Sequence, residues 1–161
     1  MEKIAILTDT ASDIDIELAE KSGIYLLPLY VNLDSKYFKD RFEISPDEFY
    51  DWVRENNSLP KTSAPSPGDL TALLEKIKSD GYEKVIMISI GANFSSTHNL
   101  FNMIKVEGLE TYVFDSGSLT MAEGIFALYA KELVDNGYTF NQVKDKLEEK
   151  RTDSKVFFTL D

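Results

Sequence analysis

Val85-Ile86-Met87-Ile88, followed closely by the polar turn Ser95-Ser96-Thr97-His98, indicates which class of fold this chain adopts. Four consecutive apolar residues are typical of a strand that is buried on both faces of a parallel sheet. A similar run, Ile4-Ala5-Ile6-Leu7, ends in Thr8-Asp9, and Thr111 to Phe114 forms another. The sequence therefore predicts an α/β fold with a mostly parallel open sheet flanked by helices.

Helix signals lie between these runs, so strand and helix alternate along the chain, as right-handed crossovers require. Capping residues predict helix starts at Asp15, at the box Ser45-Pro46-Asp47-Glu48, at Ser66, after Ser95, and at the box from Thr139 to Gln142. Further extended segments are predicted at Tyr25–Val31, Lys36–Phe42 and Val156–Phe158. Pro28 fits the first of these best at an edge or a bulge. We expect a single α/β domain over residues 1–161.

Apolar spacing also predicts apolar stripes on two of the helices. Leu100, Ile104 and Val106 are expected to lie in the helix that begins after Ser95. Ile125, Tyr129 and Leu133 recur at intervals of four residues, which predicts an apolar helical stripe.

The composition is that of a soluble globular domain, with 161 residues, 43% of them hydrophobic and 28% charged. The net charge of −11 argues against binding to nucleic acid or to anionic lipid, because both need a Lys/Arg surface. The chain contains no cysteine, which removes disulfides and thiol chemistry. The N-terminus lacks a signal-peptide pattern, and no apolar run reaches membrane-spanning length. We therefore expect a cytoplasmic protein without stable membrane association.

Hydroxyl-rich segments follow several predicted strands. Because the carboxyl ends of parallel strands meet at one edge of a sheet, the polar clusters at residues 8–12, 91–97 and 115–116 are expected to converge there. The stretch Pro60–Gly68 adds further hydroxyls in a loop before a helix. Hydroxyls and free amides at a helix N-terminus bind an anion without any basic side chain. The predicted carboxylate or phosphate ligands are Thr62, Ser63, Ser95 and Ser96, with Thr97, His98, Asp9 and Ser116 lining the crevice.

Other interpretations of these residues stay open. Ser, Thr and Asp are preferred N-caps, so Thr62–Ser63 and Ser95–Thr97 fit capping as well as ligand binding. Asp9 and Asp115 at strand ends are compatible with a small hydrolase or phosphotransferase, but the nucleophile motif G-x-S-x-G is absent. His98 is the only histidine, so no metal site is predicted. No glycine-rich phosphate loop is present, so no nucleotide or other cofactor is expected.

The order of short motifs resembles the DegV family, bacterial proteins that bind long-chain fatty acids. Thr8–Asp13 resembles the family's opening T-D-S-T-x-D, and Thr62–Gly68 resembles its T-S-Q-P-S-P-G. Phe94–Thr97 stands where the family has L-S-G-T, and Phe114–Ser116 resembles its I-D-S. The resemblance extends over the whole chain. It implies a protein that holds an acyl chain in a tunnel between two domains.

By this resemblance, Thr62, Ser63 and Ser95 hold the carboxylate of a fatty acid such as palmitate. The protein then presents the fatty acid to a separate fatty acid kinase subunit and performs no chemistry itself. Three positions differ from the family pattern: Ser96 replaces a glycine, Ala64 a glutamine and His98 a tyrosine.

The chain stops before the family's G-G-R segment and C-terminal domain, which supplies an arginine, a histidine and one wall of the tunnel. We therefore expect these 161 residues to be the N-terminal part of a two-domain protein. Each buried methylene contributes ~0.8 kcal/mol, so loss of a wall predicts weak or no fatty-acid affinity. A truncated interaction module without ligand, docking a kinase through its acidic surface, is the alternative.

Overall fold

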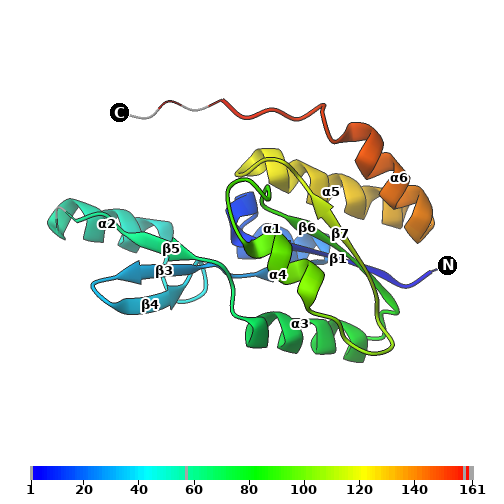
Figure 1. The fold of residues 1–161 in the computed structure, drawn as a ribbon, viewed down its shortest axis with the longest axis horizontal. Helices are drawn as coiled ribbons and strands as arrows, with labels where there is room; N and C mark the ends of the chain where they lie inside the picture. The colour runs from blue at the N-terminus through cyan, green and yellow to red at the C-terminus, as the bar shows by residue number, and fades with distance from the viewer. Residues whose placement is uncertain (1, 57, 158, 160–161) are drawn as a thin grey trace.

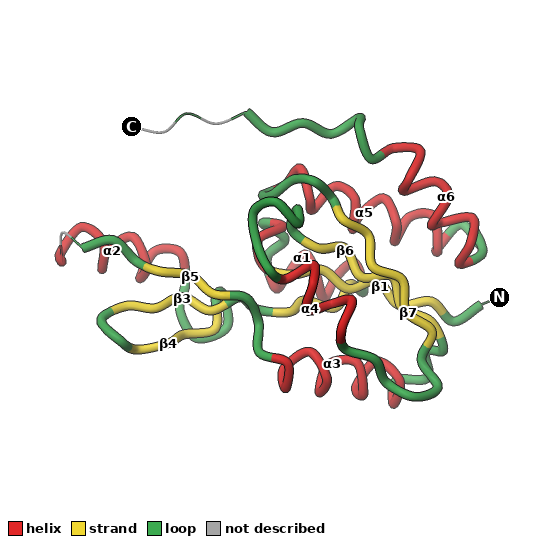
Figure 2. The backbone as a smooth tube through the Cα atoms, in the orientation of Figure 1, coloured by secondary structure: helices red, strands yellow, loops and turns green. Residues whose placement is uncertain are grey.

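The computed structural model describes residues 2–56, 58–157 and 159, and it contains a four-stranded sheet with helices on both faces (Figure 1 and Figure 2). Neighbouring strands are parallel in the order β2-β1-β6-β7. Their bounds are Ile4–Asp9 for β1, Ile24–Leu27 for β2, Lys84–Ser89 for β6 and Glu110–Asp115 for β7. The predicted α/β class with a parallel sheet is confirmed.

Two apolar clusters occupy the two faces of this sheet. Ile4 and Ile6 of β1 belong to one cluster, whereas Ala5 and Leu7 belong to the other, as the two-residue period of a strand requires. The first cluster is covered by α1 (Ile16–Ser22), α5 (Met121–Asp135) and α6 (Phe140–Lys150). The second is covered by α3 (Pro67–Ser79) and α4 (Thr97–Met103). A short 3₁₀ turn, η1 (Thr10–Ser12), follows β1.

The predicted helix starts at Asp15, Ser45, Ser66 and Thr139 are confirmed by cap hydrogen bonds, whereas the N-cap of α4, Ser96, makes none. Asp15 accepts from the amide of Leu18 at 2.7 Å, and Ser66 Oγ accepts from the amide of Asp69 at 3.0 Å. Thr139 opens α6 with a complete capping box. These signals succeed because each bond spans only three residues, so the local sequence is sufficient to specify it.

Residues 30–63 form a small unit, the lobe, whose helix and one of whose strands were predicted from the sequence, whereas its separate sheet was not. It contains β3 (Tyr30–Leu33), β4 (Lys36–Lys39), α2 (Pro46–Asn56) and β5 (Lys61–Ser63). The three strands are antiparallel, in the order β4-β3-β5. In Figure 1 the lobe projects from the carboxyl edge of the parallel sheet.

The expected single strand Tyr25–Val31 is therefore wrong. β2 ends at Leu27 and β3 begins at Tyr30, in a different sheet. Pro28 lies between them, and because proline has no amide hydrogen it cannot continue a ladder on both sides. The lobe has its own apolar cluster, which consists of Val31, Leu33, Ile44, Phe38, Phe49 and Trp52.

Two expected helical stripes are also corrected. α4 ends at Met103, and Ile104 is already extended with φ −87° and ψ 126°, so Val106 lies outside the helix. In α5 the side chain of Ile125 is 54% exposed. The buried face of α5 consists instead of Glu123, Gly124, Phe126, Ala127, Ala130 and Leu133. Small residues on this face let the helix lie close to β1 and η1.

The expected C-terminal strand is not present in the residues that are described. Val156 and Phe157 have no strand assignment, and the side chain of Phe157 is 91% exposed, whereas Phe158 and Leu160 lie outside the described residues. Figure 1 shows residues 154–157 running past the outer side of α5, and no described strand pairs with them. Among the described helices, none is long and apolar enough to cross a membrane.

Candidate functional site

The carboxyl ends of β1, β6 and β7 lie at one edge of the sheet, as predicted, and the loops that follow β6 and β7 are held together. The amide of Ser116 donates to the carbonyl of Ser89 at 3.3 Å, and the amide of Gly91 donates to the carbonyl of Ser118 at 2.7 Å. A Cβ added to Gly91 would lie 2.8 Å from the backbone of Gly117. Only glycine permits this approach of the two loops.

The hydroxyl cluster Ser95-Ser96-Thr97 lies between β6 and α4. Ser95 is partly exposed, and its Oγ accepts from the amide of Thr97 at 3.2 Å and lies 2.9 Å from Thr97 Oγ1. Ser96 is exposed and its side chain makes no cap hydrogen bond. Thr97 is fully buried. The local capping bond is thus made by Ser95 and Thr97, while the side chains of Ser95 and Ser96 remain accessible.

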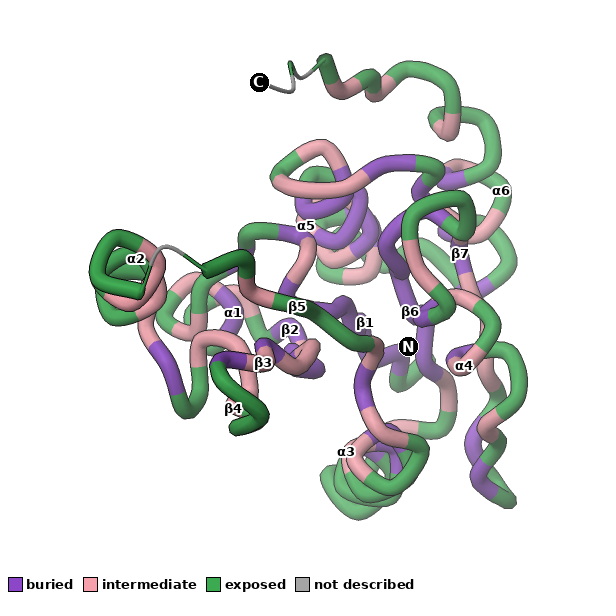
Figure 3. The backbone as a smooth tube through the Cα atoms, turned by 60° about the vertical axis from the view of Figure 1, so that its left-hand side comes forward, coloured by how far each residue is buried: buried purple, intermediate pink, exposed green. Residues whose placement is uncertain are grey.

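Thr62 and Ser63 lie on β5 rather than in the predicted loop at a helix N-terminus, and α3 is capped three residues later by Ser66. Both are exposed, and β5 is drawn green in Figure 3. Thr62 lies opposite Val31, and Ser63 lies opposite Tyr30. Since successive side chains of a strand point to opposite faces, a carboxylate beside β5 meets one of these two hydroxyls, not both.

The ring of His98 is held by hydrogen bonds on both nitrogens. Nδ1 lies 3.0 Å from Ser89 Oγ, and Nε2 lies 3.0 Å from Nδ2 of Asn102. Because Asn102 Nδ2 also donates to the carbonyl of His98 at 3.0 Å, it is the amide nitrogen, and the ring Nε2 accepts from it. The ring proton then lies on Nδ1 and is donated to Ser89, whose Oγ donates onward to the carbonyl of Phe114 at 3.4 Å.

This direction of donation is the reverse of a nucleophile–base pair, in which the serine donates to the imidazole. Ser89 is also fully buried. The Ser89–His98 contact therefore fixes the start of α4 against β6. His98, predicted to line the crevice, is only partly exposed and its ring is committed to these internal bonds.

Asp9 and Glu123 are two fully buried carboxyl groups beneath this edge. Asp9 accepts from the amides of Ala11 at 2.9 Å and Ile90 at 3.0 Å. Glu123 Oε1 accepts from Thr8 Oγ1 at 3.1 Å, while its buried Oε2 has no hydrogen-bond partner among the described residues. Asp9 is therefore an internal anchor of the Ile90 backbone and does not line an open crevice.

Burial disfavours the ionised form of both carboxyls. It raises the pKa of Asp9 to about 7, and together with the neighbouring charge of Asp9 it raises the pKa of Glu123 well above its usual value. Two amide donors favour an ionised Asp9, so Glu123 is the group that holds the proton. The sequence does not single out Glu123, because a glutamate three residues after Thr120 has the spacing of an ordinary exposed capping box.

Asp115 and Ser116 organise the turn after β7. Asp115 Oδ1 accepts from the amides of Ala92 at 3.0 Å and Gly117 at 2.9 Å. Ser116 is buried, and its Oγ accepts from the amide of Ser118 at 3.1 Å and donates to the carbonyl of that residue at 3.2 Å. These are turn contacts.

The eight predicted site residues thus divide into two groups. The accessible hydroxyls are those of Thr62, Ser63, Ser95 and Ser96. Asp9, Thr97, His98 and Ser116 instead make internal hydrogen bonds that shape the edge. Within the described residues, no group of three potential His, Cys, Asp or Glu ligands could hold a metal ion.

Residues 3–161 match a family described as "Uncharacterised protein, DegV family". A DegV domain-containing protein of Clostridium acetobutylicum is 37% identical over 163 residues, which cover 100% of this chain and 58% of that protein.

Two solved structures are similar to this fold. DegV of Bacillus subtilis, described as a fatty acid binding protein, has a TM-score of 0.85 and 31% identity over 94% of this chain and 54% of its own. A DegV family protein of Thermus thermophilus, described by its fatty acid binding, has a TM-score of 0.83 and 30% identity over 92% of this chain and 53% of its own. The chain thus spans little more than half the length of these relatives.

Proposed function

Because the chain belongs to the DegV family, we propose that it binds a long-chain fatty acid, whose carboxylate is held by hydroxyls at the carboxyl edge of the sheet. One observation carries the proposal. The loop between β6 and α4 presents the hydroxyls of Ser95 and Ser96 to solvent on a fold shared with structures described as fatty acid binding.

The Ser95 hydroxyl is suited to an anion. It has two lone pairs and one proton. The amide of Thr97 occupies one lone pair at 3.2 Å, and the Thr97 hydroxyl at 2.9 Å occupies the other when it donates. The proton of Ser95 is then available to a carboxylate oxygen, and a hydrogen bond to a charged acceptor is stronger than a neutral one.

The lobe supplies the second contact through β5. Because the side chains of Thr62 and Ser63 point to opposite faces of β5, only one of their hydroxyls binds the carboxylate together with Ser95. In this proposal the acyl chain extends away from the edge, and the bound fatty acid is presented to a separate kinase subunit that carries out the chemistry.

Binding rather than catalysis is favoured by the groups at the edge. The buried Asp9 is engaged by two amides, Asp115 closes a turn, and His98 donates toward Ser89. None of these contacts joins a base to the accessible hydroxyls of Ser95 or Ser96 among the described residues, as the alternative of a hydrolase or phosphotransferase requires.

A titration of amide chemical shifts with octanoate tests the site even at low affinity, with octanol as the uncharged control ligand. We expect octanoate to shift the amides of residues 95–99 and of β5, and octanol to leave them in place. Ser95→Ala should abolish these shifts. Ser79→Ala is the matched control, since Ser79 is also exposed and bonded locally, to the carbonyl of Lys76 at 2.8 Å. Shifts confined to other residues, or unaffected by Ser95→Ala, would refute the proposed site.

A further inference from the structure

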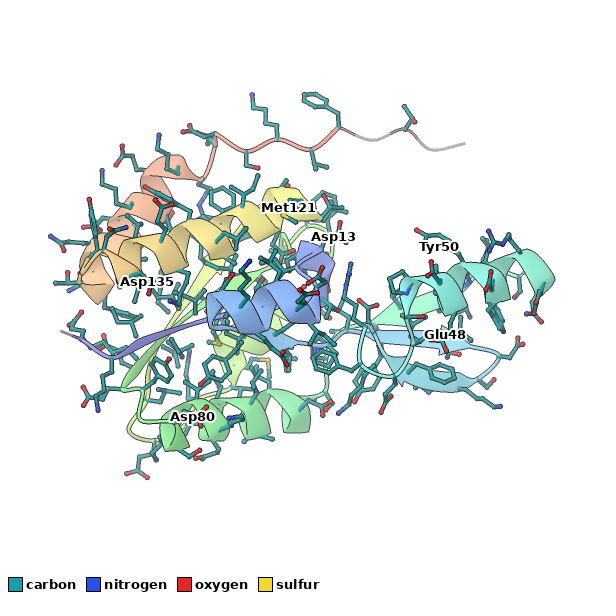
Figure 4. The ribbon with its side chains drawn as sticks, turned by 180° about the vertical axis from the view of Figure 1, so that it is seen from behind. Asp13, Glu48, Tyr50, Asp80, Met121 and Asp135 are labelled. Carbon is teal, nitrogen blue, oxygen red and sulfur yellow. The ribbon has the colours of Figure 1, made fainter. Side chains whose placement is uncertain are left out.

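The lobe is joined to the parallel sheet by a narrow neck. Two chain segments cross between them, after β2 and before α3, and they lie side by side where Tyr30 pairs with Ser63. The apolar cluster of the lobe shares no residue with the two clusters of the sheet. Figure 4 shows Glu48 and Tyr50 on α2, well apart from the body, with Asp13 on the body side of the junction. The orientation of the lobe is therefore set by contacts at its neck.

Several polar contacts lie at this neck. The amide of Leu29 donates to Thr10 Oγ1 at 3.1 Å, and Arg41 of the lobe pairs with Asp13 at 2.8 Å. A further set of hydrogen bonds is accepted by one carboxylate, that of Asp69 in the first turn of α3.

Asp69 accepts hydrogen bonds from three side chains of different elements. Tyr30 of β3 donates its hydroxyl to Oδ2 at 2.5 Å, and Lys39 of β4 donates to Oδ1 at 2.8 Å. Ser66, the N-cap of α3, donates to Oδ2 at 2.6 Å. Partial burial of Asp69 opposes its ionisation, but the bonds from Lys39, Ser66 and Tyr30 outweigh burial and lower its pKa to about 2. The carboxylate is thus ionised whenever the protein is folded near neutral pH.

We propose that Asp69 is a positioning residue, which latches β3 and β4 of the lobe to α3 and thereby sets the β5 hydroxyl against the Ser95 loop. The inference rests on the proposed function for its consequence in binding, but the latch itself is a property of the unliganded protein. β5 leads into α3 through residues 64–66 and pairs with β3. Release of Tyr30 and Lys39 frees the neck to bend while each unit keeps its own core.

A chemically matched control exists at the other end of α3. Asp80 likewise accepts from a tyrosine and a lysine, Tyr25 at 2.5 Å and Lys76 at 2.7 Å, but all three residues belong to the body. Figure 4 shows Asp80 at the end of α3 remote from the lobe. Asp80→Ala therefore removes a carboxylate that accepts from a tyrosine and a lysine, as Asp69→Ala does, but it leaves the contacts at the neck intact.

The test measures the lobe orientation directly. Because the chain has no cysteine, spin labels can be attached at Tyr50→Cys on α2 and Met103→Cys on α4, whose side chains are 60% and 77% exposed. We expect a narrow distance distribution in the parent protein and in Asp80→Ala, and a broad or displaced one in Asp69→Ala. Amide exchange in β3 and β5 should accelerate about tenfold in Asp69→Ala, as loss of a charged hydrogen bond predicts.

A second variant distinguishes a change in the orientation of the lobe from unfolding of the lobe. Lys39→Met removes one latch contact at a partly exposed position and should give a smaller change in the same direction. Fluorescence of Trp52, the single tryptophan and part of the lobe cluster, should be unchanged in both latch variants. Identical distance distributions and exchange rates for Asp69→Ala and Asp80→Ala would overturn the proposal, as would a loss of the folded Trp52 signal in Lys39→Met.

The binding consequence is read from the octanoate titration. In Asp69→Ala the shifts of β5 should be lost while those of residues 95–99 persist. Parent protein that shows no octanoate shifts would refute the proposed function, yet the distance measurement would still decide the latch. A parent protein that binds and a variant whose β5 shifts are intact would refute the latch alone.

Discussion

Glu123→Gln should make the stability of this protein much less sensitive to pH. In the folded chain Glu123 is fully buried, one oxygen accepts from Thr8 at 3.1 Å, and the other lacks a partner among the described residues. Burial and the adjacent Asp9 raise its pKa well above the ordinary value of 4.5. Glutamine keeps the shape of the protonated glutamate and supplies a donor to Asp9, so it removes the ionisation without opening a cavity.

The direction of this pH effect depends on whether the folded or the unfolded chain holds the Glu123 proton more tightly. Below the unfolded pKa both states are protonated, and the raised folded pKa has no effect. As pH rises, the unfolded chain loses the proton that the folded chain retains, so the free energy of unfolding falls by about 1.4 kcal/mol per pH unit for each such group. Above the unfolded pKa, and for as long as the folded chain keeps Glu123 protonated, the variant should therefore gain stability relative to the parent protein at up to about 1.4 kcal/mol per pH unit.

Urea denaturation followed by far-ultraviolet circular dichroism at several pH values measures this difference. The matched control is Glu132→Gln, an exposed glutamate on the same helix. We expect parallel pH profiles for the parent and the control, and a flatter profile for Glu123→Gln. A Glu123→Gln profile parallel to that of the parent would show that Glu123 titrates normally in the folded protein, and the reasoning from burial would be wrong.

Three further substitutions test the local geometry by urea denaturation. Gly91→Ala places a Cβ 2.8 Å from the backbone nitrogen of Ser118 and should cost about 1–3 kcal/mol, and an unchanged midpoint would contradict this close approach. Thr120 has φ 58° and ψ −155°, a region that glycine occupies without strain, so Thr120→Gly should stabilise the fold by about 1 kcal/mol rather than weaken it. Ser45→Ala removes the cap of α2, in which Ser45 Oγ accepts from the amide of Glu48 at 3.2 Å, and should cost about 1 kcal/mol with the loss seen in Trp52 fluorescence.

Features that depend on near neighbours in the chain were predictable from the sequence. The caps at Ser45, Ser66 and Thr139 form as expected, because each bond closes within three residues. The buried strands β1 and β6 were also predictable, since a short continuous apolar run between helical segments favours a strand that is buried on both faces of a parallel sheet.

The candidate site was predicted in composition but not in geometry. The hydroxyls of Ser95 and Ser96 are accessible after β6, as expected, whereas His98 makes internal bonds to Ser89 and Asn102. From the sequence alone, a histidine close to serines looks the same whether its ring lines a crevice or is held by internal hydrogen bonds. Its role depends on which way the proton points, and that is set by partners brought together by the fold.

The sequence alone determined the fold class, the sheet edge at which polar groups gather, and the family to which the chain is similar. Only the tertiary structure decided that Pro28 divides one expected strand between two sheets, that Thr62 and Ser63 occupy opposite faces of β5, and that Glu123 is buried beside Asp9. The reason is physical. Strand register and carboxyl burial depend on pairing between residues far apart in the chain, such as Tyr30 with Ser63 and Thr8 with Glu123, and no local pattern encodes those distances.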